Sequence, residues 1–493
     1  MIKAILSLVL LTIAFTYLPT AAAVQMNQTS CWPFSDAGTT ALRGQTKKVF
    51  AHYFSQFPIA IDNVDSSNDY YTRNFLNPLG ENKAHFNCGG FFRQRPLPRP
   101  VRPESNWADL DMRLEVTRAI ALGLDGFTYD MLSLTSTSVY WTRLLAIMKA
   151  AIYVDPAFKI VLMPDMNAGW ASSNASNLIP AIVTLVNSPD NAALYRDASG
   201  NLVISAYRAN NQSPAWWANL VSTLKTGYNI SVVLWPVFPS ITSSLISSYG
   251  ASSVGMSNWD GNCVKNAASF VNAANNLHTA GEKYMSPVMS QNHRPKEFHY
   301  WEARNSEAMR AHFMAAINGN AEWIQIITWN DYSEGTEISP SSGTQYSYYD
   351  VAAYYLRWYK LGTPPAIYRD AIYYFHRNSL TTQKPDIPAH QTQNFSLVPC
   401  DPAVDRVEVL AFLTAPANIT ITQGGNKVNK YVPAGVQSVT ANLIPGSTPV
   451  FKVTRNGATI INLTSTITVA TTIQIQDLLY RGGGSITCTR PNV

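Results

Sequence analysis

The stretch "EWIQIITWNDYSEGTEISP", residues 322–340, joins a short apolar run to a group of carboxylates. The run at residues 322–328 has the length and composition of a buried β-strand. Asp331, Glu334 and Glu337 follow it within seven positions. A strand that ends in acids either leads into a capped turn or supports a catalytic site. The remaining strands of the chain decide between these interpretations.

Seven more apolar runs resemble this one, and amphipathic patterns of helical length separate them. The eight expected strands fall in residues 47–54, 124–131, 158–166, 202–209, 230–238, 253–259, 283–290 and 322–330. The expected helices lie near 109–122, 140–153, 176–186, 214–224, 241–249, 263–278, 305–318 and 350–359. Eight strand–helix units within about 330 residues predict an α/β fold of the (β/α)₈ TIM barrel type. An open doubly wound sheet is the alternative, but it often carries a glycine-rich phosphate loop. Neither G-x-x-x-x-G-K-[ST] nor a G-x-G-x-x-G after a strand occurs here.

The last quarter of the chain has a different pattern. Residues 381–399 are rich in turn formers and predict a linker, and residues 400–493 hold β-branched runs without a helical stretch. The "RNGA" at 455–458 is typical of a type I′ hairpin turn. We therefore expect a catalytic barrel over residues 24–380, and a C-terminal antiparallel β-sandwich domain over residues 400–493.

The N-terminus and the cysteines indicate a secreted protein. Residues 1–23 combine Lys3, an apolar run and small residues ending at Ala23, as a signal peptide does; an uncleaved anchor is the alternative. In a secreted chain some of the five cysteines should pair, and at least one is left over. We expect Cys400 to pair with Cys488, which bracket the last segment, and less firmly Cys31 with Cys88. Sequons for N-glycosylation occur at Asn27, Asn174, Asn211, Asn229, Asn394, Asn418 and Asn462.

The charge pattern excludes some partners. A net charge of +5 over 493 residues is small and dispersed, which argues against nucleic-acid binding. The one basic stretch, residues 93–103, is rich in proline and predicts a solvated loop. Past the signal peptide no segment predicts a membrane span, and we expect a monomer.

Polar and aromatic residues end many of the expected strands. In a barrel these ends form the catalytic face, and hydroxyl-binding groups among aromatic rings suit a sugar. A single aromatic at such a position is more often a core residue, so the prediction rests on their coincidence over many strands. The candidate substrate-binding residues are His52, Tyr53, Tyr129, Trp235, Trp259, Asp260, Trp329 and Asn330, and Asp130 and Asp165 are further carboxylates at strand ends.

Asp331 and Glu334 are the candidate catalytic pair. Glycoside hydrolysis needs one carboxyl to protonate the leaving oxygen and a second to activate water or attack the anomeric carbon. In the alternative interpretation Asp331 caps a short helix with Glu334 as its partner. Glu337 is expected to be solvated or to act through its neighbours. The sequence has no H-E-x-x-H, so we expect no catalytic metal, and it has no G-x-S-x-G, which argues against a serine hydrolase.

These residues resemble glycoside hydrolase family 71, the secreted fungal-type α-1,3-glucanases called mutanases. The resemblance rests on "KKVFAHYF", "LDGFTYD", "LMPDM", "KYMSPVMS", "IITWNDYSEG", "DAIYYFHR" and "VEVLAFLTAPANITITQG", in this order. It implies endo-acting hydrolysis of α-1,3-glucan with inversion and no cofactor, with Glu334 as general acid and Asp331 as general base. It also implies that Asp130 or Asp165 is an auxiliary acid near the reacting sugar. Gly335 stands where the family usually has serine, and "EGTEISP" leans towards barrels that cleave α-mannosides. A hydrolase of another α-glycan such as α-mannan, and a non-catalytic carbohydrate-binding barrel, are the alternatives.

Overall fold

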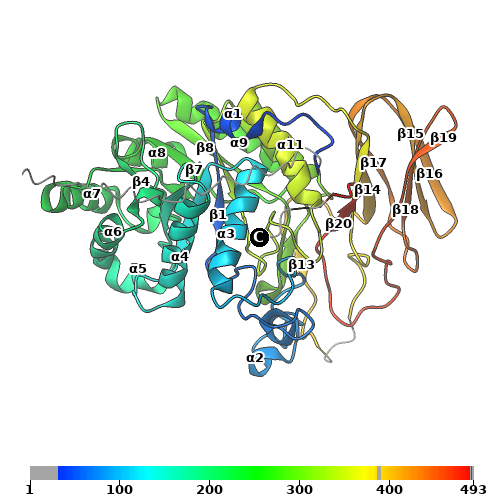
Figure 1. The fold of residues 1–493 in the computed structure, drawn as a ribbon, viewed down its shortest axis with the longest axis horizontal. Helices are drawn as coiled ribbons and strands as arrows, with labels where there is room; N and C mark the ends of the chain where they lie inside the picture. The colour runs from blue at the N-terminus through cyan, green and yellow to red at the C-terminus, as the bar shows by residue number, and fades with distance from the viewer. Residues whose placement is uncertain (1–30, 386–389, 489, 491–493) are drawn as a thin grey trace, which may run out of the picture.

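The computed structural model describes residues 31–385, 390–488 and 490. The expected signal peptide and the sequon at Asn27 lie outside these residues. In the described part of the chain, no helix is both long and apolar enough to cross a membrane. Figure 1 shows a barrel surrounded by helices, with a second, all-β layer beside it that contains the last part of the chain.

Each of the eight expected strand segments contains a parallel strand of one sheet, so the prediction of a (β/α)₈ barrel is confirmed. The strands are β1 Lys48–Tyr53, β2 Gly126–Met131, β3 Lys159–Pro164, β4 Leu202–Ile204, β5 Val232–Leu234, β6 Val237–Phe238, β7 Gly255–Asn258, β8 Lys283–Met289 and β11 Trp323–Ile327. Their order is β5-β4-β3-β2-β1-β11-β8-β7-β6. The two ends of this order, β5 and β6, are consecutive parts of one segment interrupted at Trp235 and Pro236, so the sheet closes on itself.

Side chains fill both surfaces of the barrel wall. Alternate strand residues point inward and form a cluster that includes Phe50, Val161, Met163, Val203, Met285, Trp323 and Ile327. Their neighbours point outward and pack against the surrounding helices. Because both faces of each strand are buried, the strands are apolar throughout, which is why the sequence displays them as continuous runs.

The expected helices follow the strands and differ from prediction by a few residues at their ends. They are α3 Trp107–Leu122, α4 Val139–Val154, α6 Leu178–Val186, α7 Pro214–Tyr228, α8 Ser243–Tyr249, α9 Asn266–Thr279, α10 Glu307–Asn318 and α11 Ser347–Leu361. Shorter helices lie at α1 Gly38–Arg43, α2 Gly80–Lys83 and α5 Gly169–Asn174. Ser138, Ser213 and Thr242 cap α4, α7 and α8, because each side chain accepts a hydrogen bond from the backbone N–H three residues later. Gly123 ends α3 with a positive φ of 108°, a conformation that favours glycine.

The C-terminal part forms two antiparallel four-stranded sheets, as expected of a β-sandwich. Their orders are β17-β14-β12-β20 and β16-β15-β18-β19. The strands are β12 Ala371–His376, β14 Arg406–Leu413, β15 Ala417–Gln423, β16 Asn426–Val432, β17 Gly435–Asn442, β18 Val450–Arg455, β19 Ala458–Thr464 and β20 Arg481–Gly484. Asn456 and Gly457 turn the β18–β19 hairpin with positive φ, as type I′ requires. Strand β12 belongs to the range expected for the barrel, yet it pairs with β14 and β20.

A fourth, three-stranded sheet includes the segment after β8. It consists of β9 Asn292–Arg294, β10 His299–Trp301 and β13 Ser396–Leu397, in the order β13-β10-β9. Strand β13 lies within the expected linker and pairs in parallel with β10. The expected linker therefore contributes a strand to the polar hairpin above the barrel.

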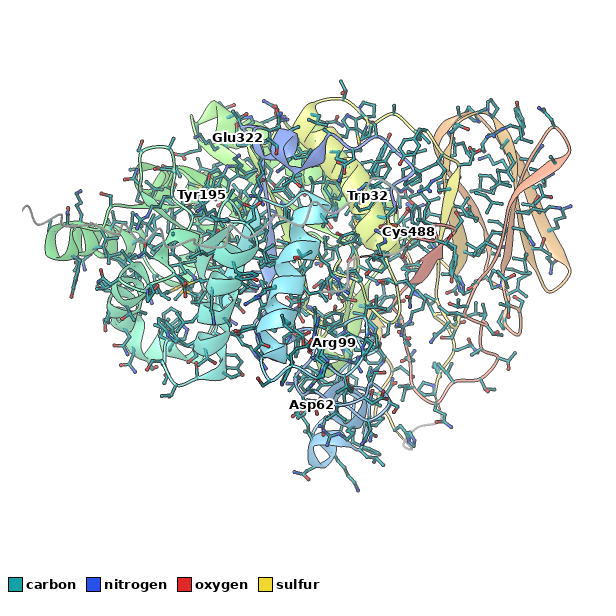
Figure 2. The ribbon with its side chains drawn as sticks, in the orientation of Figure 1. Trp32, Asp62, Arg99, Tyr195, Glu322 and Cys488 are labelled. Atoms are coloured by element: carbon teal, nitrogen blue, oxygen red, sulfur yellow. A yellow bond between two sulfur atoms is a disulfide. The ribbon has the colours of Figure 1, made fainter. Side chains whose placement is uncertain are left out.

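Both expected disulfides are wrong. The structure pairs Cys31 with Cys488 and Cys263 with Cys400, and it leaves Cys88 unpaired and buried. The N-terminal segment lies beside the end of the chain, where the guanidinium of Arg490 stacks on Trp32, and Figure 2 labels Trp32 and Cys488 there. Cys400 and Cys488 bracket the last segment of the chain, but this position does not make them partners.

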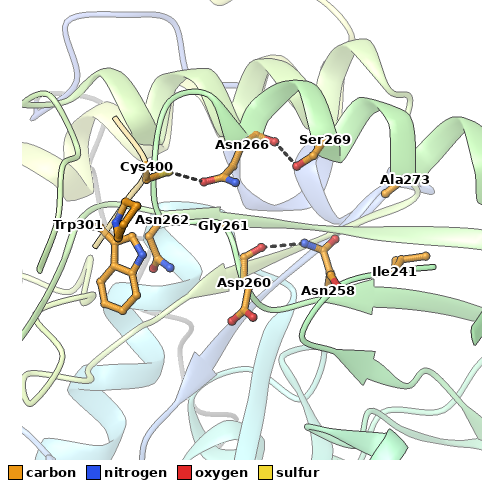
Figure 3. Close-up of a pocket in the computed structure, with 12 residues that line it drawn as sticks. Ile241, Asn258, Asp260, Gly261, Asn262, Asn266, Ser269, Ala273, Trp301 and Cys400 are labelled. Atoms are coloured by element: carbon orange, nitrogen blue, oxygen red, sulfur yellow. Dashed lines mark hydrogen bonds between the residues drawn. The ribbon is translucent and has the colours of Figure 1, made fainter. Parts of the chain in front are cut away.

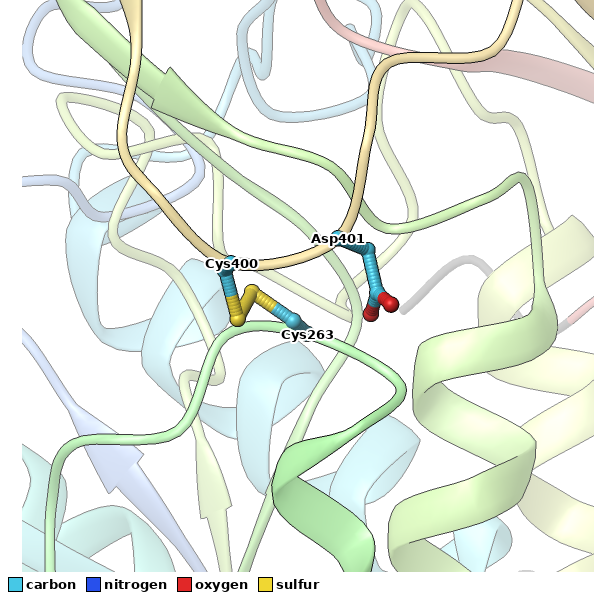
Figure 4. Close-up of side chains that lie close together, drawn as sticks. All are labelled: Cys263, Cys400 and Asp401. Carbon is cyan, nitrogen blue, oxygen red and sulfur yellow. A yellow bond between two sulfur atoms is a disulfide. The ribbon is translucent and has the colours of Figure 1, made fainter.

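The second disulfide joins the loop before α9 to the end of the expected linker. Figure 4 shows Asp401 next to this bond, and the three ligand-type atoms lie within 4.8 Å of one another. The two sulfurs are bonded to each other and are not thiolates, so this group does not form a metal site.

The basic stretch at residues 93–103 is not the solvated loop that we expected. Arg93 and Arg95 are buried, and Arg95 forms an ion pair with Asp69 at 2.5 Å. Arg99 and Arg102 both bind Asp111 of α3. These arginines hold a long loop against the barrel; three of them pair with Asp69 or Asp111, and Arg93 donates to backbone carbonyls.

Candidate active site

Asp331 lies in the loop that follows β11, where its carboxylate organises a tight turn. Its Oδ1 accepts hydrogen bonds from Ser333 N at 3.0 Å, Ser333 Oγ at 2.6 Å and Glu334 N at 3.2 Å. Its own N–H donates to Thr328 Oγ1 at 2.8 Å. The capping interpretation of Asp331 is thus correct for a turn, although no helix follows within the described loop at 328–340. Oδ2 takes no part in this capping.

Glu334 sits at the end of this turn and faces an arginine from the three-stranded sheet. Its Oε2 lies 2.8 Å from Nη2 of Arg294, and its backbone carbonyl accepts a hydrogen bond from His293 N at 2.7 Å. The side chain of Glu334 is 24% exposed, so it can reach a ligand. Strand β9 therefore binds the loop after β11 through both its backbone and a side chain.

The two carboxyls differ in electrostatic environment. Burial raises the pKa of Glu334 to about 8; Arg294 opposes this rise, and the negative charges of Asp331 and Asp260 add to it. Burial also raises the pKa of Asp331, but the hydrogen bond from Ser333 and the charge of Arg294 hold it down. Glu334 is therefore suited to hold a proton near neutral pH, and Asp331 to be the carboxylate.

Asp130 and His52 end neighbouring strands on the same face. Asp130 is 2% exposed, and its Oδ2 lies 4.0 Å from Nε2 of His52. Within the described residues Oδ1 of Asp130 has no hydrogen-bond partner, which leaves it available to a ligand. Burial, with the like charges of Asp165 and Asp331, raises the pKa of Asp130 well above its usual range. Burial lowers the pKa of His52 to about 3, so this imidazole is neutral.

Trp259, Asp260 and Asp165 complete the set that the structure brings to this face. The ring of Trp259 meets His52 edge-on at 4.9 Å and Tyr207 at 4.7 Å between centroids. Asp165 follows β3, and burial raises its pKa. Burial also raises the pKa of Asp260, against the charges of Arg208 and Arg294. The face thus combines several carboxyls with aromatic rings.

The four other aromatic residues predicted to bind substrate lie in the core instead. This is the alternative role expected for a single aromatic residue at the end of a strand. Trp329 is fully buried and donates its Nε1–H to Glu115 at 2.7 Å. Tyr53 stacks on Tyr129, and both rings are buried. Trp235 stacks on Trp323 with 3.9 Å between centroids, inside the barrel.

Asn330 and Glu337 support the loop from beneath. The amide of Asn330 accepts from Phe54 N and donates to the carbonyls of Phe54 and Phe57, so it joins the first and last strand ends. Glu337 is 1% exposed rather than solvated, and Gln94 donates to its Oε1. Burial raises the pKa of Glu337 well above its usual range. Glu337 is thus a neutral acid below the site.

Sequence reasoning missed Arg294 as a site residue. It follows the polar end of the seventh expected strand by a few positions, in "SQNHR" at 290–294. A cation near paired carboxylates would have been the signal, but only the fold of β9 and β10 brings Arg294 to Glu334.

One family model and two curated relatives match most of this chain. The model of Glycosyl hydrolase family 71 matches residues 101–480. The ascus wall endo-1,3-alpha-glucanase of Schizosaccharomyces pombe is 23% identical over 407 residues, which covers 72% of this chain and 88% of that protein. The glucan endo-1,3-alpha-glucosidase agn1 of the same organism is 24% identical over 409 residues, with 76% and 88% covered. Among solved structures, the GH99 endo-alpha-mannosidase from Bacteroides thetaiotaomicron aligns with a TM-score of 0.45 and 14% identity, over 64% of this chain and 97% of that chain.

Proposed function

We propose that this chain, which belongs to glycosyl hydrolase family 71 and is therefore a glycoside hydrolase, cleaves the α-1,3-glucosidic bonds of α-1,3-glucan, acting within the polymer. The named activities of the Schizosaccharomyces pombe relatives support this substrate. The observation that carries the proposal is the pair on the loop after β11. Two carboxyls three positions apart have different surroundings, and Arg294 contacts only one of them directly.

In the proposed mechanism Glu334 is the general acid and Asp331 the general base. Glu334 gives its proton to the glycosidic oxygen as the bond to the anomeric carbon breaks. Asp331 takes a proton from a water molecule, whose oxygen attacks that carbon from the opposite face. The α-bond is thereby converted to a β-hemiacetal, and the two carboxyls exchange protonation states. Each of the two proton transfers commonly contributes about 10²–10⁴-fold to the rate.

We assign Asp130 and Asp165 to the sugar that carries the reacting carbon. A carboxyl donates a hydrogen bond when it is protonated and accepts one when it is ionised, so both groups can bind hydroxyls of this sugar. Oδ1 of Asp130 is free of partners in the described structure and can accept a hydroxyl. His52, being neutral, can donate or accept a hydrogen bond without adding charge.

We further propose that the protein acts outside the cell. Two disulfides link segments far apart in the chain, and such bonds persist in oxidising compartments. The expected signal peptide agrees with export. A polysaccharide substrate too large to enter a cell also requires an exported enzyme.

One incubation tests the substrate. Purified protein is mixed with insoluble α-1,3-glucan and, separately, with α-mannan, and the released sugars are followed. We expect α-1,3-linked glucose oligomers from the glucan alone. Release from mannan but not from glucan would refute the assignment and favour the α-mannan alternative, and release from neither would favour a non-catalytic barrel.

Two measurements test the mechanism. Proton NMR of the first product should display the β-anomer, and an early α-anomer would exclude inversion. Asp331→Asn and Glu334→Gln should each lower kcat by about 10³-fold or more while the protein stays folded. Near-normal rates in either variant would exclude that residue as a catalytic group.

A further inference from the structure

A cavity of about 390 Å³ lies beside Asp260, between the loops after β6 and β7, helix α9 and the hairpin β9–β10. This volume falls in the range of about 300–1,000 Å³ that small-molecule sites occupy. Figure 3 shows the Asp260 carboxylate and the Trp301 ring both pointing away from α9. Pro399 and Cys400, from the end of the expected linker, close one side.

Neither carboxyl of the pair lines the cavity, but Glu334 is connected to it through Arg294. Arg294 links the two places, because its Nη2 lies 2.8 Å from Glu334 Oε2 and its guanidinium lies 5.1 Å from the centre of the Trp301 ring. Asp260 is close enough to raise the pKa of Glu334. Asp331 instead influences Asp130, on the other side of the pair. In an inverting hydrolase the acid faces the leaving group, and the base faces the water behind the reacting sugar.

The lining has the chemistry of a sugar site. Trp301 presents a partly exposed ring for the C–H face of a pyranose, and Asp260 presents carboxylate oxygens to hydroxyl groups. The amide of Asn262 lines the same space while its Oδ1 accepts from Asn292 at 2.8 Å. A site of this kind is built for hydroxyl-rich rather than apolar ligands.

The walls are fixed before any ligand arrives. The Cys263–Cys400 disulfide joins the loop after β7 to the linker. Asn266 Oδ1 accepts from Cys263 N at 3.1 Å, and Asp401 Oδ2 accepts from Lys265 N at 3.1 Å. A preformed cavity loses little conformational entropy when a ligand binds.

We propose that this cavity binds the glucosyl unit on the leaving-group side of the scissile bond, with Trp301 stacking on its ring and Asp260 accepting from its hydroxyls. The inference rests on the proposed function. It assigns Trp301 and Asp260 to substrate positioning, and it explains why a disulfide joins the barrel and the linker at this place.

Two substrates with the same reacting sugar separate the cavity from the catalytic pair. The first is an α-1,3-linked glucose pentasaccharide, which can place sugars on both sides of the bond. The second is an α-1,3-linked trisaccharide activated as its α-fluoride, whose leaving group is fluoride and needs no sugar site. Trp301→Ala should lower kcat/KM for the pentasaccharide by about tenfold to a hundredfold, as loss of a central aromatic contact commonly does. It should change the rate on the fluoride by no more than about twofold.

A second variant fills the cavity without removing a ring that packs on Arg294. Ala273 lines the cavity from α9, and Ala273→Phe should reproduce the selective loss on the pentasaccharide. Asn275→Phe is the matched control, because Asn275 is exposed and lies on the opposite face of the same helix. It should leave both rates within about twofold of the wild type.

The outcomes distinguish the two proposals. Selective loss in both cavity variants supports the inference. Wild-type activity on both substrates, with equal losses or no losses in the variants, overturns the cavity assignment and leaves the proposed function standing. A wild-type protein that hydrolyses neither substrate overturns the proposed function and this inference together.

Discussion

Replacement of Arg294 by glutamine should move the pH dependence of hydrolysis to higher pH. The active form needs Glu334 protonated and Asp331 charged, so Asp331 sets the acidic limb of the profile and Glu334 the alkaline limb. Arg294 lowers the pKa of both carboxyls. Its removal therefore raises both pKa values: activity falls on the acidic side and persists further on the alkaline side.

The ion pair sets the size of the shift. With Nη2 and Oε2 2.8 Å apart, the two charges are centred about 4 Å apart, which gives about 4 kcal/mol at an effective dielectric constant near 20. This is an upper limit of about three pKa units at 1.36 kcal/mol each. The side chains of Arg294 and Glu334 are 21% and 24% exposed, so solvent screens part of the interaction. We expect the alkaline limb to rise from near pH 8 by about one to two units, and the acidic limb by less.

The assay is kcat/KM against pH on a soluble α-1,3-linked oligosaccharide, for the wild type, Arg294→Gln and Arg294→Lys. The lysine variant keeps the charge, so its limbs should stay within about half a unit of the wild type. The reasoning fails if the glutamine variant leaves both limbs in place or moves them to lower pH. It also fails if lysine shifts them as far as glutamine does.

Four other changes have expected outcomes. Glu337→Gln should keep most activity and make the free energy of unfolding fall less steeply as the pH rises. The reason is that Glu337 keeps its carboxyl proton in the folded protein above about pH 4.3, where the unfolded chain has lost it. A calorimetric dependence of stability on pH equal to that of the wild type would contradict this. Asp130→Asn should lower kcat/KM by about 10–100-fold without lowering the Tm, and an unchanged rate would remove Asp130 from the site. Gly335→Ser should cost about 2–4 kcal/mol of unfolding free energy, since a side chain here is strained at φ 65° and meets Leu479. Leu479→Ala should recover about 1 kcal/mol or more of this cost relative to additivity in a double-mutant cycle. Cys88→Ser should shift the Tm little, whereas reduction of the two disulfides should lower it by several degrees.

The barrel could be predicted because its strands are buried on both faces. Apolar runs such as 158–166 and 283–290 stand out in the sequence, and counting them gives the fold. The three-stranded sheet β13-β10-β9 could not be predicted in this way. Its strands are two or three residues long and largely polar, as in "NHR" at 292–294, and their partner comes from a segment about a hundred residues later.

The candidate site was predictable in its acids but less so in its aromatics. Asp331 and Glu334 follow a strong strand, so their position at the barrel mouth follows from the count of strands. Trp329 and Asn330 precede them directly, yet one side chain points to α3 and the other braces the first strand. Where a strand passes into a loop its alternation is lost, and the sequence no longer tells which side a residue faces.

The C-terminal segment supports the loop that carries the candidate pair. A β-carbon on Gly335 would lie 2.5 Å from Leu479 Cδ2, so the turn beside Glu334 is shaped by a residue just before β20. Arg481 in β20 donates to Gln94, and Gln94 in turn donates to Glu337 beneath Asp331. A chain that ended before residue 400 would lose these supports and the Cys263–Cys400 bond. The place of Gly335, where the family usually has serine, therefore follows from packing: serine would require both a positive φ and a gap that Leu479 fills.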